Sequence, residues 1–403
     1  MHLKSCKKTY NIETQRAVPL EETLARIEPK VPAAGITRVA DITNLDRIGI
    51  PVFSCIRPTA EAGAITVYNG KGATVEESRI SAIMEGIERY SSELHDRRVH
   101  LAPYEEMQAH GRVLDPKDLI LPEGANTDRP MPWVEGYDIA NDQNIIVPAH
   151  AVFHPLPRHF LPLFRTNTNG LASGNTLEEA IFHALSEVIE RDAWSLVEAS
   201  RDTGSSVVNI GDEVCLGMQK KFADAQVDVL VRDITSDIGI PTMAAVADDV
   251  LLRDPMLLTI GIGTHTSARI AVMRALTEVA QSRLTQIHGA REDTTQAELR
   301  KRMGYDRAKR INAYWFKDNG VLDYNRIVSY DSDDFLTDIR FIIKALKKQE
   351  LDRVIVVDLT REEIGIPVVR VIVPGLEVYA MDPERRGDRV NHAQDHRLSR
   401  PKS

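Results

Sequence analysis

The sequence contains few cysteines and no long apolar segment. Its three cysteines, Cys6, Cys55 and Cys215, are far apart and include no Cys-x-x-Cys pair, which is typical of reduced structural thiols in a cytosolic protein. The first nine residues lack the apolar core of a signal peptide, and no run approaches the roughly 18 apolar residues of a membrane helix. We therefore expect a soluble, cytoplasmic protein that does not associate with membranes.

The sequence also lacks a basic surplus and the common nucleotide-binding fingerprints. Its net charge of −9 argues against a nucleic-acid partner, because phosphate backbones bind basic faces. The phosphate-binding loop G-x-x-x-x-G-K-S/T, the protein-kinase glycine loop and the dinucleotide fingerprint G-x-G-x-x-G ahead of a helix are all missing. A nucleotide site in this chain must therefore have another design.

The histidines between residues 100 and 159 match no common zinc-site spacing. They are His100, His150, His154 and His159, and we expect surface or packing roles for them. No nucleophile can be assigned either, since Cys55 has no recognisable base partner in the sequence. The catalytic residues of any reaction are thus not predicted.

Helix and strand patterns alternate along the chain, but several strand patterns are adjacent. This order predicts a mixed α+β (α/β) fold, in which mixed sheets are flanked by helices. Helices are predicted at 19–27, 74–89, 176–199, 268–283 and 335–347. Strands are predicted at 36–42, 50–56, 133–137, 144–148, 226–232, 242–246, 256–262, 353–359 and 368–373.

Four segments carry more specific expectations. Pro51 interrupts the strand pattern at 50–56 and predicts an edge strand. The small residues at 69–74 and 169–175 predict turns. The segment 289–333 is charged and poorly periodic, which indicates loop with a short helix. The tail from Pro383 is rich in arginine and poor in apolar residues, so alone it is expected to be disordered.

The predicted helices at 74–89, 176–199 and 268–283 share one acidic pattern. Acidic positions in each recur at helical spacing, so the helix carries them on one face, with an arginine at the end. The matching residues are Glu77, Glu85, Glu88 and Arg89; Glu179, Glu187, Glu190 and Arg191; and Glu278 and Gln281, with Arg283 displaced by one position. His183 lies on the same face, where a catalytic base and a packed histidine are both open.

Each repeat presents two oxygen ligands three residues apart, after a turn whose amides are free for phosphate oxygens. Mg²⁺ binds such carboxylates together with substrate phosphates. Convergence of the three helices predicts a nucleoside triphosphate site with several Mg²⁺ ions, clamped by Arg191 and Arg283. The alternative is a solvated acidic face, stabilised by capping boxes at Thr74 and Thr176 and by ion pairs of about 0.2–0.5 kcal/mol each. Spacing alone leaves both interpretations open.

Together these motifs resemble the YcaO family. The resemblance spans about residues 14–377, and the stretches that carry it are Glu85–Arg89, Asn169–Asn175, Glu179 with Glu187–Arg191, and Ala275–Arg283. It implies an enzyme that uses ATP and Mg²⁺ to phosphorylate a backbone amide during nucleophilic attack, giving an azoline, amidine or thioamide. It also implies a YcaO domain at 71–403 with a basic C-terminal tail, and an N-terminal region at 1–70 integral to the fold.

The resemblance assigns site residues by position. The implied Mg²⁺ ligands are Glu85, Glu88, Glu179 and Glu190. The implied ATP contacts are Arg16, Thr23, Asn175, Glu187, Arg191, Glu278 and Gln281, to which the spacing argument adds Arg283. One departure is Ala172, where some members carry a serine whose contact is either lost here or supplied by Ser173.

Three N-terminal stretches, 15–24, 35–41 and 45–52, resemble the archaeal branch that thioamidates a glycine of methyl-coenzyme M reductase. This resemblance implies thioglycine formation in the alpha subunit of that enzyme, in methanogenesis, with sulfide as nucleophile and a TfuA-like partner for its delivery. A homodimer is compatible with the sequence.

Two other functions remain. An azoline-forming cyclodehydratase acting on a ribosomal peptide is less favoured, because such members often end in Pro-x-Pro-x-Pro, whereas residues 400–403 contain one proline. A nucleotide-binding protein without chemistry is the alternative outside enzymes.

Overall fold

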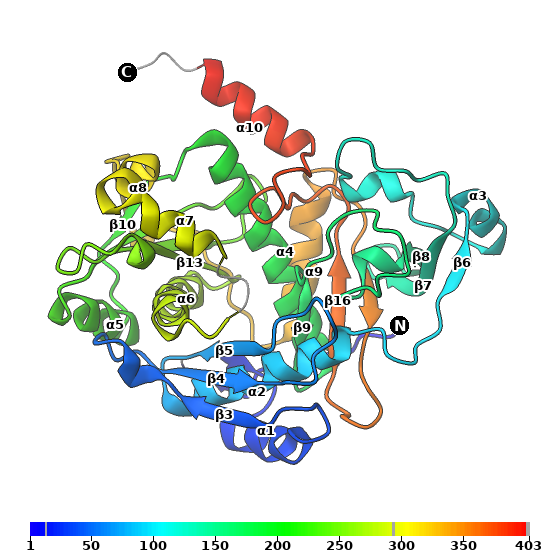
Figure 1. The fold of residues 1–403 in the computed structure, drawn as a ribbon, viewed down its shortest axis with the longest axis horizontal. Helices are drawn as coiled ribbons and strands as arrows, with labels where there is room; N and C mark the ends of the chain where they lie inside the picture. The colour runs from blue at the N-terminus through cyan, green and yellow to red at the C-terminus, as the bar shows by residue number, and fades with distance from the viewer. Residues whose placement is uncertain (13, 292–294, 400–403) are drawn as a thin grey trace.

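The computed structural model describes residues 1–12, 14–291 and 295–399. Within these ranges, three larger sheets surround the centre of the molecule (Figure 1). The first is antiparallel, in the order β3-β4-β5, with β3 at Arg38–Asp41, β4 at Val52–Ile56 and β5 at Val67–Lys71. A two-stranded ribbon, β1 (Tyr10–Asn11) and β2 (Gln15–Arg16), precedes it.

The second sheet has the order β6-β7-β15-β16-β9, with β8 paired to β7. Its strands are β6 (His100–Ala102), β7 (Met131–Asp138), β8 (Gln143–Pro148), β9 (Leu171–Ser173), β15 (Ile355–Asp358) and β16 (Val368–Ile372). The third sheet has the order β13-β12-β11-β10-β14, with β10 at Ser206–Val208, β11 at Asp228–Asp233, β12 at Thr242–Asp248, β13 at Thr259–Thr264 and β14 at Val321–Asp323. The mixed α+β class is therefore confirmed.

Three long helices, α2 (Val75–Ser92), α4 (Leu177–Ser200) and α6 (Ala268–His288), lie between the sheets. The other α-helices are α1 (Leu20–Ile27), α3 (Tyr104–Met107), α5 (Glu213–Asp224), α7 (Thr295–Met303), α8 (Tyr305–Ile311), α9 (Phe335–Lys347) and α10 (Asp388–Ser399). No helix in the described ranges has the length and apolar character needed to cross a membrane.

Each long helix directly follows the edge strand of a different sheet, which gives three strand–helix units: β5–α2, β9–α4 and β13–α6. Glycines let a helix lie close on its own strand. A Cβ at Gly70 would be 2.0 Å from the backbone nitrogen of Ala82, and one at Gly261 would be 2.1 Å from that of Val279. Such approaches require a residue without a side chain.

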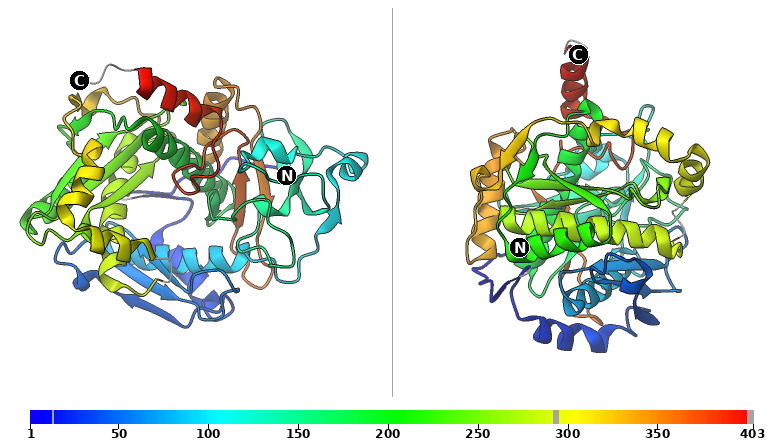
Figure 2. Two further views of the ribbon diagram at one scale, coloured as in Figure 1. Left: turned by 45° about the horizontal axis from the view of Figure 1, so that its top comes forward. Right: turned by 90° about the vertical axis from the view of Figure 1, so that its left-hand side faces the viewer.

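The three units form a closed ring. Besides its own strand, α2 contacts β9, α4 contacts β13, and α6 contacts β5. Figures 1 and 2 show these helices next to one another in the middle of the molecule, although they come from distant parts of the chain. Each unit is thus supported by the next one.

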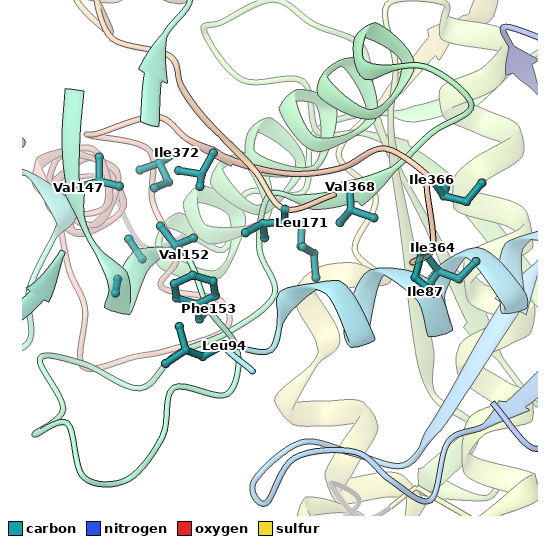
Figure 3. Packing of buried hydrophobic residues seen from close by; sticks show 14 of the residues in the cluster. Ile87, Leu94, Val147, Val152, Phe153, Leu171, Ile364, Ile366, Val368 and Ile372 are labelled. Carbon is teal, nitrogen blue, oxygen red and sulfur yellow. The ribbon is translucent and has the colours of Figure 1, made fainter. Parts of the chain in front are cut away.

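A buried apolar cluster fixes α2 against the six-stranded sheet. Ile87 of α2, Leu171 of β9 and Val368 of β16 belong to this cluster, which Figure 3 shows from close by. Side chains of this kind contribute roughly 1.5–3 kcal/mol each when they are fully buried. The cluster therefore holds the polar face of α2 in a defined position.

The expected helices and strands are found near their predicted ranges, but four local predictions need correction. β4 is a central strand, because Pro51 precedes its first residue and needs no ladder hydrogen bond. Residues 69–71 belong to β5 and residues 171–173 form β9, so the predicted turns are limited to the residues on either side of these strand segments. Strand β5 also crosses the expected boundary at residue 70, and the division into 1–70 and 71–403 remains a prediction.

The fourth correction concerns the C-terminal tail, expected to be disordered when alone: in the folded chain it forms α10 up to Ser399 and lies against α4 (Figure 2). The guanidinium of Arg389 is 2.8 Å from a carboxylate oxygen of the buried Asp192 and 2.6 Å from one of Asp237. Arg385 is itself buried and donates to the carbonyl oxygen of Ile120. Arg385 and Arg389 thus fix the tail on the fold through carbonyl and acidic partners.

Candidate functional site

A cavity of about 740 Å³ opens where α2, α4 and α6 meet. Protein pockets for small molecules span about 300–1,000 Å³, so this one is large enough for a nucleotide. Eight predicted site residues line it: Arg16, Glu85, Glu88, Glu187, Glu190, Arg191, Glu278 and Gln281. The convergence of the three repeated motifs is thus observed.

Two of these glutamates anchor one unit of the ring to the next. Glu88 of α2 accepts hydrogen bonds from the backbone N–H of Ser173 in β9 (3.1 Å) and from its hydroxyl (2.7 Å). Glu190 of α4 accepts one from the backbone N–H of Thr264 in β13 (3.0 Å). Each carboxylate is thereby oriented, while its unused lone pairs remain available to a ligand in the cavity.

Gln281 joins the third unit to the first with the roles exchanged: its side chain donates a hydrogen bond, whereas Glu88 and Glu190 accept one. Its side-chain N–H donates to the backbone carbonyl oxygen of Asn69 in β5. The strand presents an acceptor here, so a donor is required, and this explains why the third motif has glutamine where the others have Glu88 and Glu190.

The electrostatic environment of the carboxylates favours a bound cation. Burial raises the pKa of Glu88 to about 7, against the hydrogen bond from Ser173. Burial, assisted by the charge of Glu278, raises the pKa of Glu190 to about 7, and burial also raises that of Glu187. The negative charges of these ionised carboxylates are therefore only partly balanced by positive groups of the free protein. A divalent cation would stabilise them.

Glu278 differs because Lys71 pairs with it directly. Although burial acts in the opposite direction, the ammonium group of Lys71, with Arg191, holds the pKa of Glu278 below its usual value. This carboxylate is ionised and already has a cation of the protein beside it. It is consequently a weaker candidate for a metal ligand than Glu190.

Arginines supply donors for an anion in the same cavity. The Nε atoms of Arg89, Arg191 and Arg274 are buried, and within the described part of the chain they have no hydrogen-bond partner. Arg191 lies 3.8 Å from Glu187 and 3.6 Å from Glu190, and Arg274 also lines the cavity. Unused guanidinium donors beside undercompensated carboxylates fit a ligand with both phosphate oxygens and Mg²⁺.

Arg274 is a cavity residue that was not predicted from the sequence. It lies four residues before Glu278 and so faces the same side of α6. This spacing was the available signal, but no equivalent arginine occurs at that position in α2 or α4, which have Ser81 and His183 there.

Glu179 and Asn175 lie beside the cavity rather than on its surface. The carboxylate of Glu179 is fully buried, 3.6 Å from Arg16, and accepts a hydrogen bond from the backbone N–H of Ala17 (2.9 Å). The side-chain amide of Asn175 donates to it at 3.2 Å. Glu179 thus reaches the cavity through Arg16, which it orients.

Two predicted ATP contacts are placed elsewhere. Thr23 is buried on α1, and its hydroxyl donates to the carbonyl oxygen of Pro19 (3.0 Å). Arg283 is fully buried in ion pairs with Asp46 (2.9 Å) and Asp249 (3.0 Å). Its displacement by one residue turns its side chain by about 100° around the helix, and Ser282 lines the cavity instead.

His183 lines the cavity as a neutral imidazole. Burial, with the charges of Arg274 and Arg16, lowers its pKa to about 3. A base this weak is poorly suited to accept a proton near neutral pH. The hydroxyl of Ser173, the residue after Ala172, donates a hydrogen bond to the carboxylate of Glu88. Its hydrogen atom is therefore already used within the protein.

Comparisons with known proteins identify relatives of the whole chain. The family model described as YcaO cyclodehydratase, ATP- and Mg²⁺-binding, matches residues 69–377. An uncharacterized protein of Methanothermobacter thermautotrophicus is 50% identical over 380 residues, 93% of this chain and 98% of that protein. An uncharacterized protein of Rhizobium leguminosarum bv. trifolii, named for its place in the tfuA 3′ region, is 32% identical over 90% of this chain and 89% of its own length.

Solved structures share the fold. YcaO from Methanopyrus kandleri, bound with AMPPCP and Mg²⁺, is 28% identical and has a TM-score of 0.81. The match covers 95% of this chain and 98% of that chain. A heterocyclase in complex with substrate and cofactor has a TM-score of 0.80 at 23% identity, over 94% of this chain and 54% of that chain. The chain therefore belongs to the YcaO family and takes ATP and Mg²⁺ as its cofactors.

Proposed function

We propose that this protein is an ATP- and Mg²⁺-dependent thioamide synthase that replaces the oxygen of a glycine backbone amide with sulfur. The proposed substrate is the alpha subunit of methyl-coenzyme M reductase, with sulfide delivered by a TfuA-like partner. Three observations support the proposal: the N-terminal stretches of the thioamidating branch, a relative of 50% identity in Methanothermobacter thermautotrophicus, and a relative named for its place beside tfuA.

One observation carries the reaction class. Buried carboxylates of α2 and α4 and unused guanidinium donors of α4 and α6 line the same cavity. We assign Mg²⁺ binding to Glu85, Glu88, Glu187 and Glu190. We assign phosphate binding to Arg191 and Arg274, with Arg16 held beside them by Glu179. When bound, ATP and Mg²⁺ supply a transferable phosphoryl group and neutralise the charge that develops during transfer.

The residues of the chain mainly position and stabilise. Glu88 and Glu190 are held by backbone N–H groups of neighbouring strands, so their oxygens require little reorganisation when a cation binds. Arg274 offers a donor to a developing phosphate charge, and the neutral His183 offers a hydrogen-bond site rather than a proton sink.

The amide substrate explains why phosphorylation is required. An amide carbon is a poor electrophile, and its oxygen is a poor leaving group. In the proposed reaction hydrosulfide adds to the carbonyl carbon, and the resulting oxyanion accepts the γ-phosphoryl group. The carbon–oxygen bond then breaks, phosphate departs with that oxygen, the sulfur loses its proton, and a C=S bond forms. ADP, phosphate and the thioamide are the products.

Mass spectrometry of the target peptide tests the proposal. Incubation of the protein with Mg·ATP, sulfide and the substrate should add about 16 Da to the glycine peptide through exchange of oxygen for sulfur. The Glu190→Gln variant provides the matched control. Phosphate release without any mass change in the peptide would contradict the proposed substrate.

The same experiment distinguishes a second candidate. The matching family description names a cyclodehydratase, which favours azoline formation on a peptide as the alternative. That reaction removes water, so the peptide would lose about 18 Da. A loss of this size, independent of sulfide, would replace the thioamide proposal.

A further inference from the structure

Three side chains with metal-ligating atoms meet far from the nucleotide cavity. They are His100, Glu106 and His110, and one ligand atom from each lies within 4.8 Å of the others. The centroids of the two imidazole rings are 5.5 Å apart. Figure 1 shows their elements, β6 and α3, at the end of the second sheet that is remote from α6.

Local structure brings these side chains together. Glu106 belongs to α3, and His110 ends the short 3-10 helix Gln108–His110 that continues it. Their spacing of four residues places both on one side of the helical segment. His100 begins β6, just before this segment, and adds a ligand from a strand.

The backbone around the cluster is firmly held. Strand β6 pairs with β7, and the indole N–H of Trp133 donates to the carbonyl oxygen of Ala102 (2.9 Å). Met107, between Glu106 and His110, is buried in the main apolar cluster. Tyr104 stacks on Trp133 with 6.2 Å between ring centroids. Because the backbone is already fixed, binding of an ion would order only the three side chains and not the segment that carries them.

The three side chains are also not engaged otherwise. Among the residues that the structure describes, none of the three has a hydrogen-bond or ion-pair partner, although His100 and His110 face each other. The set of two imidazoles and one carboxylate suits Zn²⁺ and similar ions, whereas Mg²⁺ prefers oxygen ligands alone. The cluster therefore differs in chemistry from the carboxylate-rich cavity.

We propose that His100, Glu106 and His110 form a second metal site, which binds a divalent transition-metal ion such as Zn²⁺. Three protein ligands leave at least one coordination position of a tetrahedral ion for water or for a group of a bound molecule. Binding ties the helical segment of α3 to β6, and so stabilises this edge of the second sheet.

Calorimetric titration of Zn²⁺ into the full-length protein tests the site. The nucleotide cavity is first saturated with Mg²⁺ and AMPPCP, so that its glutamates do not compete. One equivalent of Zn²⁺ should bind, and His100→Ala and His110→Ala should each weaken the binding by at least about tenfold. His159→Ala removes an exposed histidine outside the cluster and should leave the affinity unchanged.

A second measurement reports the ligand set directly. Co²⁺ in place of Zn²⁺ should give the visible absorption of a low-coordinate nitrogen and oxygen site, and Glu106→Gln should alter that spectrum. Circular dichroism checks that each variant is folded. Equal Zn²⁺ affinity of His110→Ala and the unaltered protein, or binding equally weakened by His159→Ala, would overturn the proposal.

Discussion

Gln281 donates to the carbonyl oxygen of Asn69 at the motif position where Glu88 and Glu190 accept N–H groups. Replacing this donor with an acceptor tests whether the hydrogen bond between α6 and β5 stabilises the ring. Gln281→Glu should lower the free energy of unfolding by about 1–3 kcal/mol, because two acceptors then face each other at a partly buried site. Chemical denaturation measures the change.

The same substitution at an exposed glutamine, Gln108→Glu, is the control and should leave stability nearly unchanged. Equal stability of the two variants would show that the hydrogen bond between α6 and β5 is not required.

Glu190→Gln should remove metal-dependent ATP binding and leave the fold intact. The glutamine oxygen can still accept from Thr264, but the negative charge for Mg²⁺ is lost. Calorimetry should show Mg·ATP affinity reduced by at least about tenfold, or 1.4 kcal/mol, with unchanged circular dichroism. Glu198→Gln, on the same helix and outside the cavity lining, should bind normally. Normal binding by Glu190→Gln would remove this glutamate from the site.

The stability of the free protein should depend on pH through Glu88 and Glu190. Their folded-state pKa values are raised from 4.5 to about 7, so the folded protein binds more protons than the unfolded chain between these values. Their contribution to stability is therefore lost as pH rises from about 4.5 to 7. Thermal unfolding should show a weaker loss in Glu190→Gln, and added Mg²⁺ should offset it at pH 7.5. An equal loss in both proteins would contradict the raised pKa of Glu190.

Arg274 and Arg283 should have opposite phenotypes. Arg274→Met should weaken Mg·ATP binding with little effect on unfolding, because its Nε has no described protein partner to leave behind. Arg283→Met should destabilise the fold by about 3–5 kcal/mol, because it leaves Asp46 buried without its partner and Asp249 paired with Arg47 alone. Calorimetry and urea denaturation on both variants separate the two roles. Loss of ATP affinity in Arg283→Met at full stability would restore it as a contact.

Arg389→Ala should destabilise the C-terminal helix. Asp192 is fully buried and would lose its cation, at an expected cost of about 3–5 kcal/mol. Limited proteolysis should then cut the chain within α10 faster, and urea denaturation should show the lower stability. Arg386→Ala, which removes an exposed arginine of the same tail, should behave like the unaltered protein. Similar proteolysis of both variants would contradict the docking of α10 through Asp192.

The convergence of the motif helices was predictable because local spacing places Glu187 and Glu190 on one face, and the pattern recurs in α2. The partners of that face were not predictable. Ser173 and Asn69 are in strands whose small residues also suit turns, and their role depends on helices distant in sequence. Arg283 was misassigned because a one-residue displacement is minor in an alignment but large around a helix. The order of α10 depends on Asp192, which the sequence of the tail does not contain.

The ring of β5–α2, β9–α4 and β13–α6 has a consequence for how the protein acquires activity. Each helix is completed by a strand from another unit, and the last helix returns to the first strand. A nascent or truncated chain without β13 and α6 therefore leaves both Glu190 and Asn69 without their ring partners. Closure of the ring accordingly requires the chain to be made at least through α6, which ends at His288.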